Sequence, residues 1–380
     1  MADLDRHDLV GAHPGTGDHP AVRAVTPVLE VLATQAGVID VDGVRREHLD
    51  ALAGAGFFRA GVPVADGGAG APPEVQRELV EQLAAASGSV WFVATQHRSP
   101  MEAARQNPSA AAGARWRDGL VSGTTLGAVA FAHIRRAGPP SVTATRTQGG
   151  WRVDGRLDWL TSWGLADVVL LMAETADHQV VLALLPLAPR DGWVVTGPLQ
   201  LAAMSATSTV GVLLDGVLVR DDEVVDIVDR AEWLAADACR TANVNPATFG
   251  LLRAVVDDLH RLGSARSQPR ATEAAEALAD ETRQLRARAY SLIDSSSDDE
   301  AIEERLQLRS GSLQLALRAT AARIAAEGGF AMTTRSPAQR WAREAMFHLV
   351  QAQTQPLREA LLAGFAKAAA DAAAPPKESS

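Results

Sequence analysis

The sequence predicts an α+β protein in which a block of β-strands separates two groups of helices. Apolar residues recur at helical spacing over 22–120, and again in long segments rich in Ala, Leu and Arg over 231–370. Between 123 and 225 the pattern changes to short runs of Val, Leu and Thr broken by Gly, Pro and Asp. Because helices and strands occupy separate blocks, we expect this class rather than a doubly wound α/β sheet.

Composition limits the kinds of protein this can be. Of 380 residues, 47% are hydrophobic and 22% charged, which is the balance of a globular protein with a sizeable core. The net charge of −10 predicts no nucleic-acid partner, because phosphate recognition needs a concentrated positive field. The most apolar stretches, 168–173 and 180–188, are shorter than the ~20 residues of a membrane helix, so no membrane span is expected. The lone Cys239 and an N-terminus without an apolar signal core predict a cytoplasmic protein.

The change in periodicity divides the chain into parts. Residues 1–20 and 371–380 are expected to be flexible tails. An N-terminal helical domain is expected over 21–120, a middle β domain over 121–228 and a C-terminal helical bundle over 229–370.

Within these parts the pattern predicts individual elements. Helices are expected from Val22, over 47–58, over 73–86 and from Ser89, with the Gly-rich segment 66–70 as a turn. Strands are expected over 149–155, 167–173, 179–187, 192–196 and 209–219.

Several kinds of site are excluded by missing motifs. The Gly-rich segment 66–70 lacks the spacing of a phosphate-binding loop, and the hydrolase motif GxSxG does not occur. The nine histidines include no HxxxH or HExxH pair, and one cysteine adds no second ligand, so no metal site is predicted.

Five segments in register across residues 45–358 resemble the acyl-CoA dehydrogenase family. They are the Ala-Gly-hydrophobic, Val-Pro and Gly-Gly-x-Gly series at 49–70; Gly-Gly-Trp at 149–155; Trp-Leu-Thr-Ser at 159–162 with Ala-Asp at 166–167; the Met-Ser and Asp-x-Val strands at 204–209 and 215–219; and Gly328-Gly329 followed by Pro337, Arg340, Arg343 and Glu344. The resemblance implies an N-terminal helical domain, a middle β-barrel or sandwich domain and a C-terminal four-helix bundle.

The resemblance also implies an activity. Members of this family are flavoprotein oxidoreductases that use FAD for CH–CH oxidation of an acyl thioester, here acyl-CoA or an acyl-carrier-protein thioester, and assemble as homodimers or homotetramers. FMN is the alternative flavin, and an electron-acceptor flavoprotein or a flavin reductase is the expected redox partner.

Carried onto this sequence, the resemblance suggests cofactor-binding residues. Trp159, Leu160, Thr161 and Ser162 match the segment along the isoalloxazine ring, although Trp159 could instead belong to the barrel core. Gly328 and Gly329 match a glycine pair where a neighbouring subunit's backbone approaches the FAD diphosphate, although the pair could be a helix C-cap.

Other flavin-binding features of the family are altered. The family's Thr-Glu-Pro loop is replaced near 131–140, where His133, Arg135 and Arg136 offer charge and donors for a phosphate or pyrimidine edge, if the loop is not simply exposed. Thr354, which matches the end of a family Glu-Gly-Thr motif, is a further candidate cofactor contact.

The position of the catalytic base departs most from the pattern of the family. The family's Glu is replaced by Ala352, which cannot accept a proton. Some members carry the base on the first helix of the C-terminal domain, where Asp237 is the nearest carboxylate and Arg240 lies about one turn further. Weaker candidates are Glu344, Glu359, His97 and His348.

The loss of the Glu keeps two other hypotheses open. A flavin-dependent monooxygenase of the same fold uses reduced flavin supplied by a reductase and needs no base for an α-proton. A catalytically inactive subunit of a hetero-oligomer needs no base either.

Overall fold

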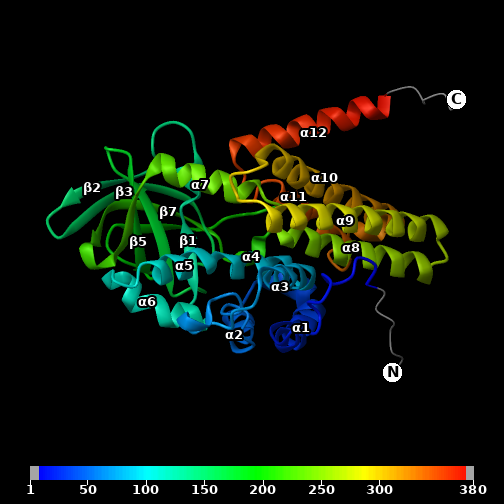
Figure 1. Ribbon diagram of the computed structural model, residues 1–380, viewed down its shortest axis with the longest axis horizontal. Helices are drawn as coiled ribbons and strands as arrows, with labels where there is room; N and C mark the ends of the chain where they lie inside the picture. Colours follow the sequence, from blue (N-terminus) through cyan, green and yellow to red (C-terminus); the bar gives the residue numbers. More distant parts are fainter. Residues whose placement is uncertain (1–7, 374–380) are drawn as a thin grey trace. The chain divides into compact units, whose positions relative to one another are not determined.

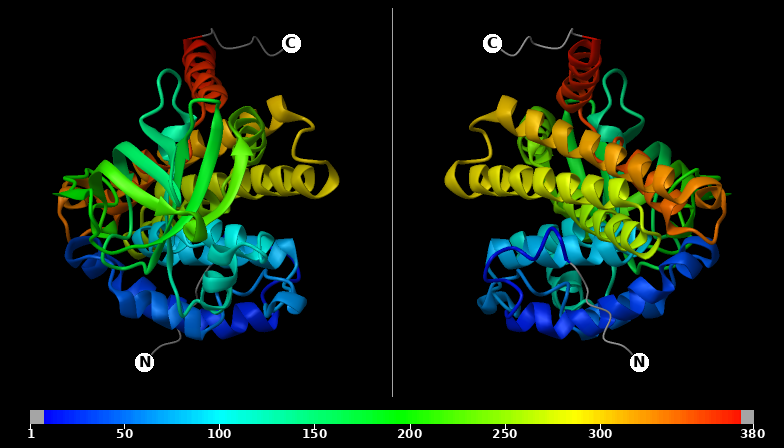
Figure 2. Two further views of the ribbon diagram at one scale, coloured as in Figure 1. Left: turned by 90° about the vertical axis from the view of Figure 1, so that its left-hand side faces the viewer. Right: turned by 90° about the vertical axis from the view of Figure 1, so that its right-hand side faces the viewer.

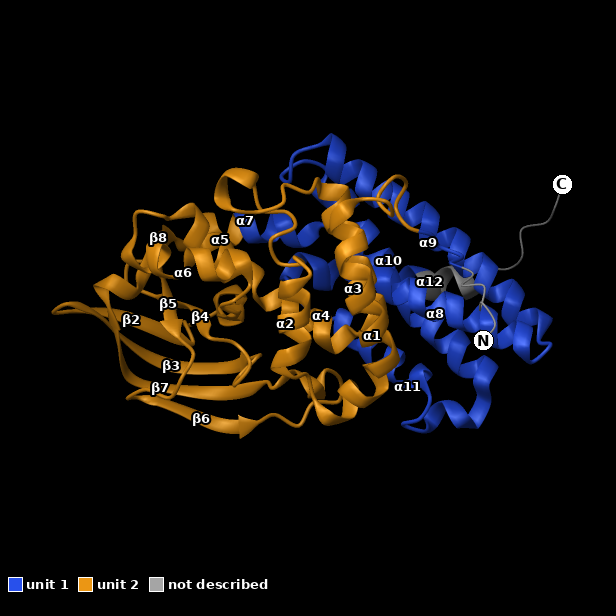
Figure 3. Cartoon of the chain, turned by 90° about the horizontal axis from the view of Figure 1, so that it is seen from below, with its two compact units in different colours: residues 1–11, 236–380 blue, residues 12–235 orange. Residues whose placement is uncertain are grey.

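A computed structural model describes residues 8–373 (Figure 1). The chain forms two compact units, one of residues 12–235 and one that joins residues 1–11 to residues 236–380 (Figure 3). The first unit contains both the predicted N-terminal helices and the predicted middle β domain. These two regions therefore pack as one body.

Six helices and a sheet make up the described part of residues 12–235. The helices are α1 (Pro20–Asp42), α2 (Arg46–Gly54), α3 (Pro73–Ala86), α4 (Gly88–Gln96), α5 (Arg98–Gln106) and α6 (Ala111–Ser122). Local sequence sets their ends: Pro73 occupies the first position of α3, where a missing N–H costs nothing, and Ser87 accepts the Val90 N–H to cap α4. The Gly-rich segment 66–70 forms a turn as predicted, with Gly67 at a φ of 86°.

The sheet has eight strands in the order β6-β7-β3-β2-β4-β5-β8, with β1 pairing parallel to β4. The strands are β1 (Gly127–Ala130), β2 (Val142–Thr147), β3 (Gly150–Leu160), β4 (Val168–Glu174), β5 (Gln179–Pro186), β6 (Trp193–Pro198), β7 (Val210–Arg220) and β8 (Val224–Asp229). The five predicted strands are present, and β1, β2 and β8 were not predicted. Most neighbouring pairs are antiparallel.

The two most apolar strands, β4 and β5, are covered by helices. Helices α5 and α6 lie against the sheet (Figure 2). Their residues form one apolar cluster with those of β4 and β5, which includes Met101, Leu120, Leu170 and Leu184. Because helices cover this part of the sheet, both strands read as continuous apolar runs rather than as alternating patterns.

The second unit is helical. Its helices are α8 (Pro246–Ala265), α9 (Pro269–Ser295), α10 (Ile302–Glu327), α11 (Pro337–His348) and α12 (Gln355–Ala373), and α7 (Arg230–Ala242) runs across the boundary between the units. One apolar core joins α8, α9, α10 and α11, with Phe249, Tyr290, Leu315 and Trp341 among its members. This arrangement agrees with the predicted C-terminal bundle.

The segment Asp8–Gly11 differs from the expected flexible tail. Val10 is 3% exposed and belongs to the apolar core of the second unit. Arg286 donates to the carbonyl oxygens of Val10 and Gly11, and the Leu9 N–H donates to Asp257 at 2.9 Å. The Leu9-Val10 pair therefore fixes this segment on the bundle, whereas residues 1–7 and 374–380 of the expected tails lie outside the described residues.

One helix of the described part of the chain, α1, is long and apolar enough to cross a membrane, with a mean hydropathy of 1.4 over its most apolar window. The sequence expectation that apolar stretches are too short therefore does not hold for α1, whose apolar residues are spread among polar ones. A buried face, formed by Val22, Val25, Leu29, Leu32, Ala36 and Ile39, shows that α1 also serves as a core helix of its unit.

Candidate functional site

The first candidate site lies at the end of β3. The register of β3 against β7 shifts between Leu157 and Leu160, which places one extra residue in β3 and makes a β-bulge. Leu157 and Leu160 are 1% and 0% exposed, although a regular strand would place them on opposite faces. The bulge turns Trp159 outward, with 51% of its surface exposed. The structure therefore places Trp159 outside the core, and the alternative that it is a core residue is wrong.

Buried threonine hydroxyls join this end of β3 to the start of β7. The Oγ1 atom of Thr209 lies 3.0 Å from that of Thr161 and 2.9 Å from that of Thr207. Thr207 also donates to the main-chain oxygen of Met204 at 2.8 Å. Because these hydroxyls bond to one another, they hold the main chain beside Trp159 in one conformation.

Backbone strain gathers at the same place. Ser162, Met204 and Ser208 have φ angles of 72°, 57° and 49°, a region that residues with a Cβ rarely adopt. Such positions cost of order 1–3 kcal/mol each and concentrate at ligand-binding sites. Hydrogen bonds from the N–H of Ser162 to Thr207 and from the N–H of Trp163 to Ser208 keep the strained turns in place.

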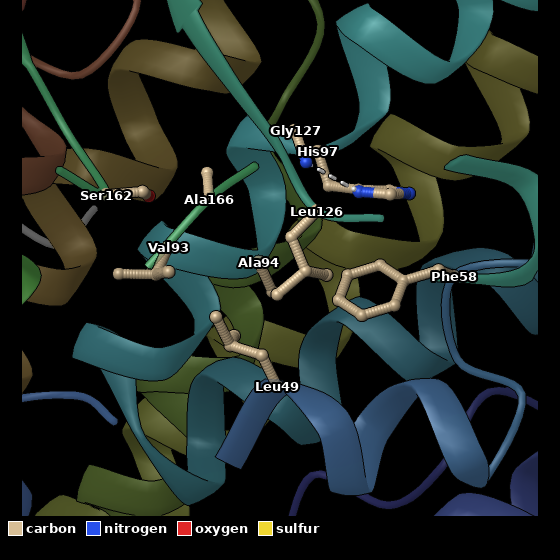
Figure 4. A pocket seen from close by; sticks show the side chains of 9 residues that line it. All are labelled: Leu49, Phe58, Val93, Ala94, His97, Leu126, Gly127, Ser162 and Ala166. Carbon is tan, nitrogen blue, oxygen red and sulfur yellow. Dashed lines mark hydrogen bonds between the residues drawn. The ribbon is translucent and has the colours of Figure 1, made fainter. Parts of the chain in front are cut away.

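The other members of the predicted flavin wall are buried. Leu160, Thr161 and Ser162 are 0%, 5% and 1% exposed, so their side chains do not reach the outer surface that Trp159 occupies. The Ser162 hydroxyl has no hydrogen-bond partner among the described residues. Ser162 lines a cavity of about 10 Å³, large enough for about one water molecule (Figure 4).

His97 lines the same cavity and links α6 to β1. Its Nδ1 accepts the Gly127 N–H at 3.1 Å (Figure 4). Nε2 therefore carries the proton and donates to the Leu120 carbonyl at 2.8 Å. Burial lowers the pKa of His97 to about 4. His97 is therefore a neutral structural link and not a general base.

The loop that precedes β2 is held near the bulge. It includes the short helix η2 (Ala132–Arg135), and Arg136 bonds at 2.6 Å to Asp158, the neighbour of Trp159. Arg156 also pairs with Asp158 at 2.8 Å. The Arg136 and Arg156 guanidinium groups outweigh desolvation and keep the pKa of Asp158 below its usual range. Asp158, the residue that precedes Trp159 in β3, is therefore the centre of a charged cluster with Arg136 and Arg156.

His133 differs from the role suggested by its sequence. It is buried, and its Nε2 lies 2.9 Å from the Met172 carbonyl oxygen. Burial lowers its pKa to about 4, so His133 is uncharged at neutral pH. The expectation that it brings positive charge to a phosphate is therefore wrong.

In the helical unit, Gly328 and Gly329 end α10 with their main chain exposed. Gly328 has φ 76° and ψ −152°, a conformation essentially confined to glycine. A Cβ at Gly329 would meet no atom within 4 Å, and its φ is not positive. The fold thus requires glycine at 328 as a helix C-cap but not at 329.

Ala352 and Asp237 lie in parts of the helical unit that one arginine connects. Arg309, which is buried, donates to the carbonyl of Thr241 near the end of α7 and to that of Gln351 at 2.9 Å. Asp237 lies one turn before Thr241, whose hydroxyl donates to the Asp237 carbonyl at 2.7 Å. The turn that carries Ala352 is therefore tied to the helix end that carries Asp237.

The candidate residues around this turn differ in backbone conformation, burial and contacts. Ala352 has a φ of 48°. Asp237 is 5% exposed, and its carboxylate lies 3.8 Å from Arg240. Thr354 is partly buried and precedes α12, where its carbonyl accepts the Arg358 N–H.

The weaker candidate bases have structural partners. Glu344 is buried and pairs with Arg340 at 2.7 Å, and Glu359 accepts a hydrogen bond from Gln355 on the exposed side of α12. Burial, followed by the charge of Arg309, lowers the pKa of His348 to about 3. Each of the three therefore has a structural partner or a lowered pKa.

Sequence reasoning missed the residues that organise these sites. Thr207 and Thr209 lie in a segment that carried the family resemblance, but their pattern gave no role. Arg309 is one of many arginines in the C-terminal helices, and nothing local distinguishes it. Within residues 8–373 no group of three or more His, Cys, Asp and Glu side chains is placed to hold a metal ion.

The fold that these elements form is that of the acyl-CoA dehydrogenases. The chain aligns with butyryl-CoA dehydrogenase from Megasphaera elsdenii at a TM-score of 0.74, with 16% identity over 96% of this chain and 98% of that one. No protein-family model matches the sequence, and no curated protein matches it at the sequence level. The resemblance stated from the motifs is confirmed as a likeness of fold.

Two further structures of this fold are solved with small molecules. Indole-bound TdsC from Paenibacillus sp. A11-2 aligns at a TM-score of 0.75, with 18% identity over 92% of this chain and 97% of that one. PigA with FAD and proline aligns at a TM-score of 0.74, with 16% identity over 94% of this chain and 98% of that one.

Proposed function

We propose that the protein is an FAD-dependent oxidoreductase. The observation that carries this proposal is the bulge in β3, which exposes Trp159 beside the strained main chain of Ser162 and Ser208. An exposed aromatic ring next to fixed main-chain groups suits a planar ring with polar edges. The likeness of fold to PigA with FAD supports the same cofactor.

The residues present fit a flavin in chemical character. Trp159 offers an apolar face. Arg135 and Arg136 offer positive charge in the loop before β2, where Arg135 lies over the Phe131 ring and Arg136 pairs with Asp158, the residue before Trp159. The main chain at Gly328 and Gly329 is exposed and has no side chain to keep an anionic diphosphate away, although the Gly328 N–H itself donates to the Ile324 carbonyl. Leu160, Thr161 and Ser162 would act through their main chain or by fixing the wall, because their side chains are buried.

The first candidate reaction is CH–CH oxidation of an acyl thioester. Bound FAD would accept a hydride from the β-carbon. The α-proton must pass to a base of the protein, so that the electrons of its C–H bond form the new C=C bond. Since Ala352 has no basic group, Asp237 on α7 is the proposed base, and Arg309 would hold α7 and the Ala352 turn together.

A second candidate is oxygen-dependent oxidation of a small molecule with reduced flavin. This chain has Ala352 where a base for α-protons is expected, and two structures of its fold carry indole or proline rather than a thioester. A flavin reductase would then be the redox partner, in place of an electron-acceptor flavoprotein. The inactive-subunit hypothesis predicts that neither reaction occurs.

The localisation and the oligomeric state of the protein are part of the proposal. We propose a cytoplasmic homodimer or homotetramer, since flavin sites of the proposed type are completed by a neighbouring subunit. Light scattering at micromolar concentration would give a mass of at least twice 40.0 kDa, and a monomer would contradict the proposal.

One experiment separates the candidates. The full-length protein is purified with excess FAD, its absorption spectrum is recorded, and it is mixed anaerobically with acyl-CoA thioesters of several chain lengths. Bleaching of the flavin supports the dehydrogenase. Oxygen consumption that requires a flavin reductase and a small aromatic substrate supports the second candidate. A protein that takes up neither FAD nor FMN would end both proposals.

A further inference from the structure

The outer side of α1 carries an apolar face in addition to the buried one. Val31, Val38 and Val41 are 53%, 59% and 68% exposed. Ala24 and Pro27 are exposed on the same side of the helix. Large exposed aliphatic side chains in one row on a helix are unusual for a surface that faces only water. This second face is called the outer stripe below.

The outer stripe follows the spacing of paired helices. Its members are Ala24, Pro27, Val31, Thr34, Val38 and Val41, separated alternately by three and four residues. This interval pattern makes a straight seam along two helices that pack side by side. The Thr34 hydroxyl donates to the Val31 carbonyl of the same helix at 2.7 Å. Thr34 therefore presents no unsatisfied polar group to a partner.

The outer stripe is symmetric about the middle of the helix. Ala24 and Val41 lie equally far from the midpoint between residues 32 and 33, and the same holds for Pro27 with Val38 and for Val31 with Thr34. Two copies of α1 placed antiparallel would therefore set each stripe residue opposite its counterpart. A surface that matches itself in this way is what a two-fold interface requires.

Charge favours the antiparallel arrangement. The only basic residue of α1, Arg23, lies at its start, while Asp40 and Asp42 lie at its end. Antiparallel copies bring Arg23 level with the acidic end of the other helix, whereas parallel copies would bring the two acidic ends together. Helices that bind lipid surfaces carry Lys and Arg beside the apolar face, and α1 does not.

We propose that the outer stripe of α1 is an interface with a second copy of this chain, in which the two α1 helices pack antiparallel about a two-fold axis. The contact extends over a helix of 23 residues, roughly 34 Å long. It involves none of the residues assigned to flavin binding, so it is independent of the proposed function.

The first test measures the mass of the full-length assembly across a concentration series. Val31→Glu/Val38→Glu would bury acidic groups in the seam and weaken association at least about tenfold, so the concentration at which the mass falls by half should rise at least about tenfold. Val194→Glu changes a valine that is also 53% exposed but lies on β6, and it should leave the mass unchanged. An unchanged mass in the double variant would overturn the proposal.

The second test reads the direction of packing by disulfide formation, with Cys239 replaced by Ser. The two single variants are Ala24→Cys and Val41→Cys. Residues 24 and 41 lie about 25 Å apart along α1, which is too far for a disulfide within one chain. In the antiparallel arrangement, cross-linked dimers form only when the two single variants are mixed. Cross-linking of either variant alone would show parallel packing, and no cross-linking would show no pairing; both outcomes overturn the proposal.

A lipid surface as the occupant is a separate outcome. If the protein floats with vesicles of phosphatidylcholine and phosphatidylserine, and Val31→Glu/Val38→Glu abolishes flotation without changing the mass in solution, the outer stripe binds lipid and the two-fold interface is rejected.

Discussion

Leu157 and Leu160 point into the same core although they lie on one strand at positions that should face opposite sides. The β-bulge between them is what exposes Trp159. Bulges of this kind are found beside active sites, where they redirect a side chain. The exposure of Trp159 therefore follows from the backbone of β3 and does not depend on the packing of its side chain.

Trp159→Ala should weaken FAD binding by about three- to tenfold while leaving the fold intact. The ring would lose its contact with the flavin, and aromatic contacts of this kind contribute about 0.5–1.5 kcal/mol beyond area burial. Because 51% of Trp159 is exposed, the midpoint of thermal unfolding without flavin should change little. Fluorescence titration with FAD measures the affinity.

Two variants control this experiment. Trp159→Phe keeps an aromatic face and should recover most of the affinity. Trp151→Ala removes a tryptophan from the other end of β3, where Arg146 stacks on it, and should leave the affinity unchanged. Equal affinity in Trp159→Ala and the wild type would remove Trp159 from the site.

Gly329→Ala should lower flavin content without lowering stability. A methyl group at Gly329 meets no protein atom within 4 Å, so the free energy of unfolding should stay within about 0.5 kcal/mol of the wild type. The same methyl group would block close approach of a diphosphate. Flavin content after gel filtration, compared with chemical denaturation of the apoprotein, separates the two effects.

Gly328→Ala is the matched control. Its φ of 76° and ψ of −152° do not suit a residue with a Cβ, so this change should destabilise the protein by about 1–3 kcal/mol. If Gly329→Ala retains full flavin content, the glycine pair is a helix C-cap and nothing more.

The sequence predicted the elements whose stability is local. Helices such as α3 carry their apolar periodicity within themselves, and strand β4 is recognisable from its continuous apolar run. Strand β1 does not: its four residues include two Ala and one Gly, and it forms because it pairs with β4, some 40 residues later. Because this stabilisation comes from a distant strand, the sequence of β1 itself has no pattern that predicts a strand.

The site was predictable in composition but not in geometry. The Trp-Leu-Thr-Ser motif pointed to Trp159, yet only the shift in pairing with β7 shows that Trp159 is exposed while Leu160 is not. The sequence predicts a charge on His133 because its loop stands where the resembled family has a flavin-binding loop. Its burial against the Met172 carbonyl depends on a strand distant in sequence.

Stability should fall steeply as the pH drops from 6.5 toward 4. Burial lowers the pKa of His97 and His133 to about 4 and that of His348 to about 3, whereas these groups bind a proton near 6.5 when unfolded. The unfolded state therefore takes up more protons in this window, and each histidine costs roughly 3 kcal/mol at the acid end. Denaturation at a series of pH values measures the slope.

Asp257 has the opposite effect on the pH dependence of stability. Burial raises its pKa to about 6, so its folded form binds a proton that the unfolded form has lost, and stability gains from it as the pH falls from 6 to 4. Burial also lowers the pKa of His48, so four histidines with lowered pKa values outweigh the one carboxyl with a raised pKa, and the net effect is a loss of stability toward acid. His97→Gln should reduce the acid-side slope by about one proton, and a stability that stays constant from pH 7 to 4 would contradict the neutral assignment.

The last prediction concerns the base. If the protein oxidises acyl thioesters through Asp237, Asp237→Asn should slow flavin bleaching by an acyl-CoA about 10²–10⁴-fold, the usual contribution of a positioned base. FAD affinity should not change. Asp237 is 5% exposed and lies near Arg240, so unfolding curves must show that Asp237→Asn is folded.

Ala352→Glu tests the same reaction from the other side of the Arg309 link. Ala352 already has a φ of 48°, and the steric strain of this backbone conformation arises at the Cβ, which Ala and Glu share. Replacing Ala by Glu should therefore add little backbone strain. A Glu at this position should therefore be tolerated, and it should restore bleaching in the Asp237→Asn background if only the base is missing. If neither single variant changes the rate and oxygen consumption requires a flavin reductase, no α-proton is removed, and the protein is the oxygen-dependent enzyme.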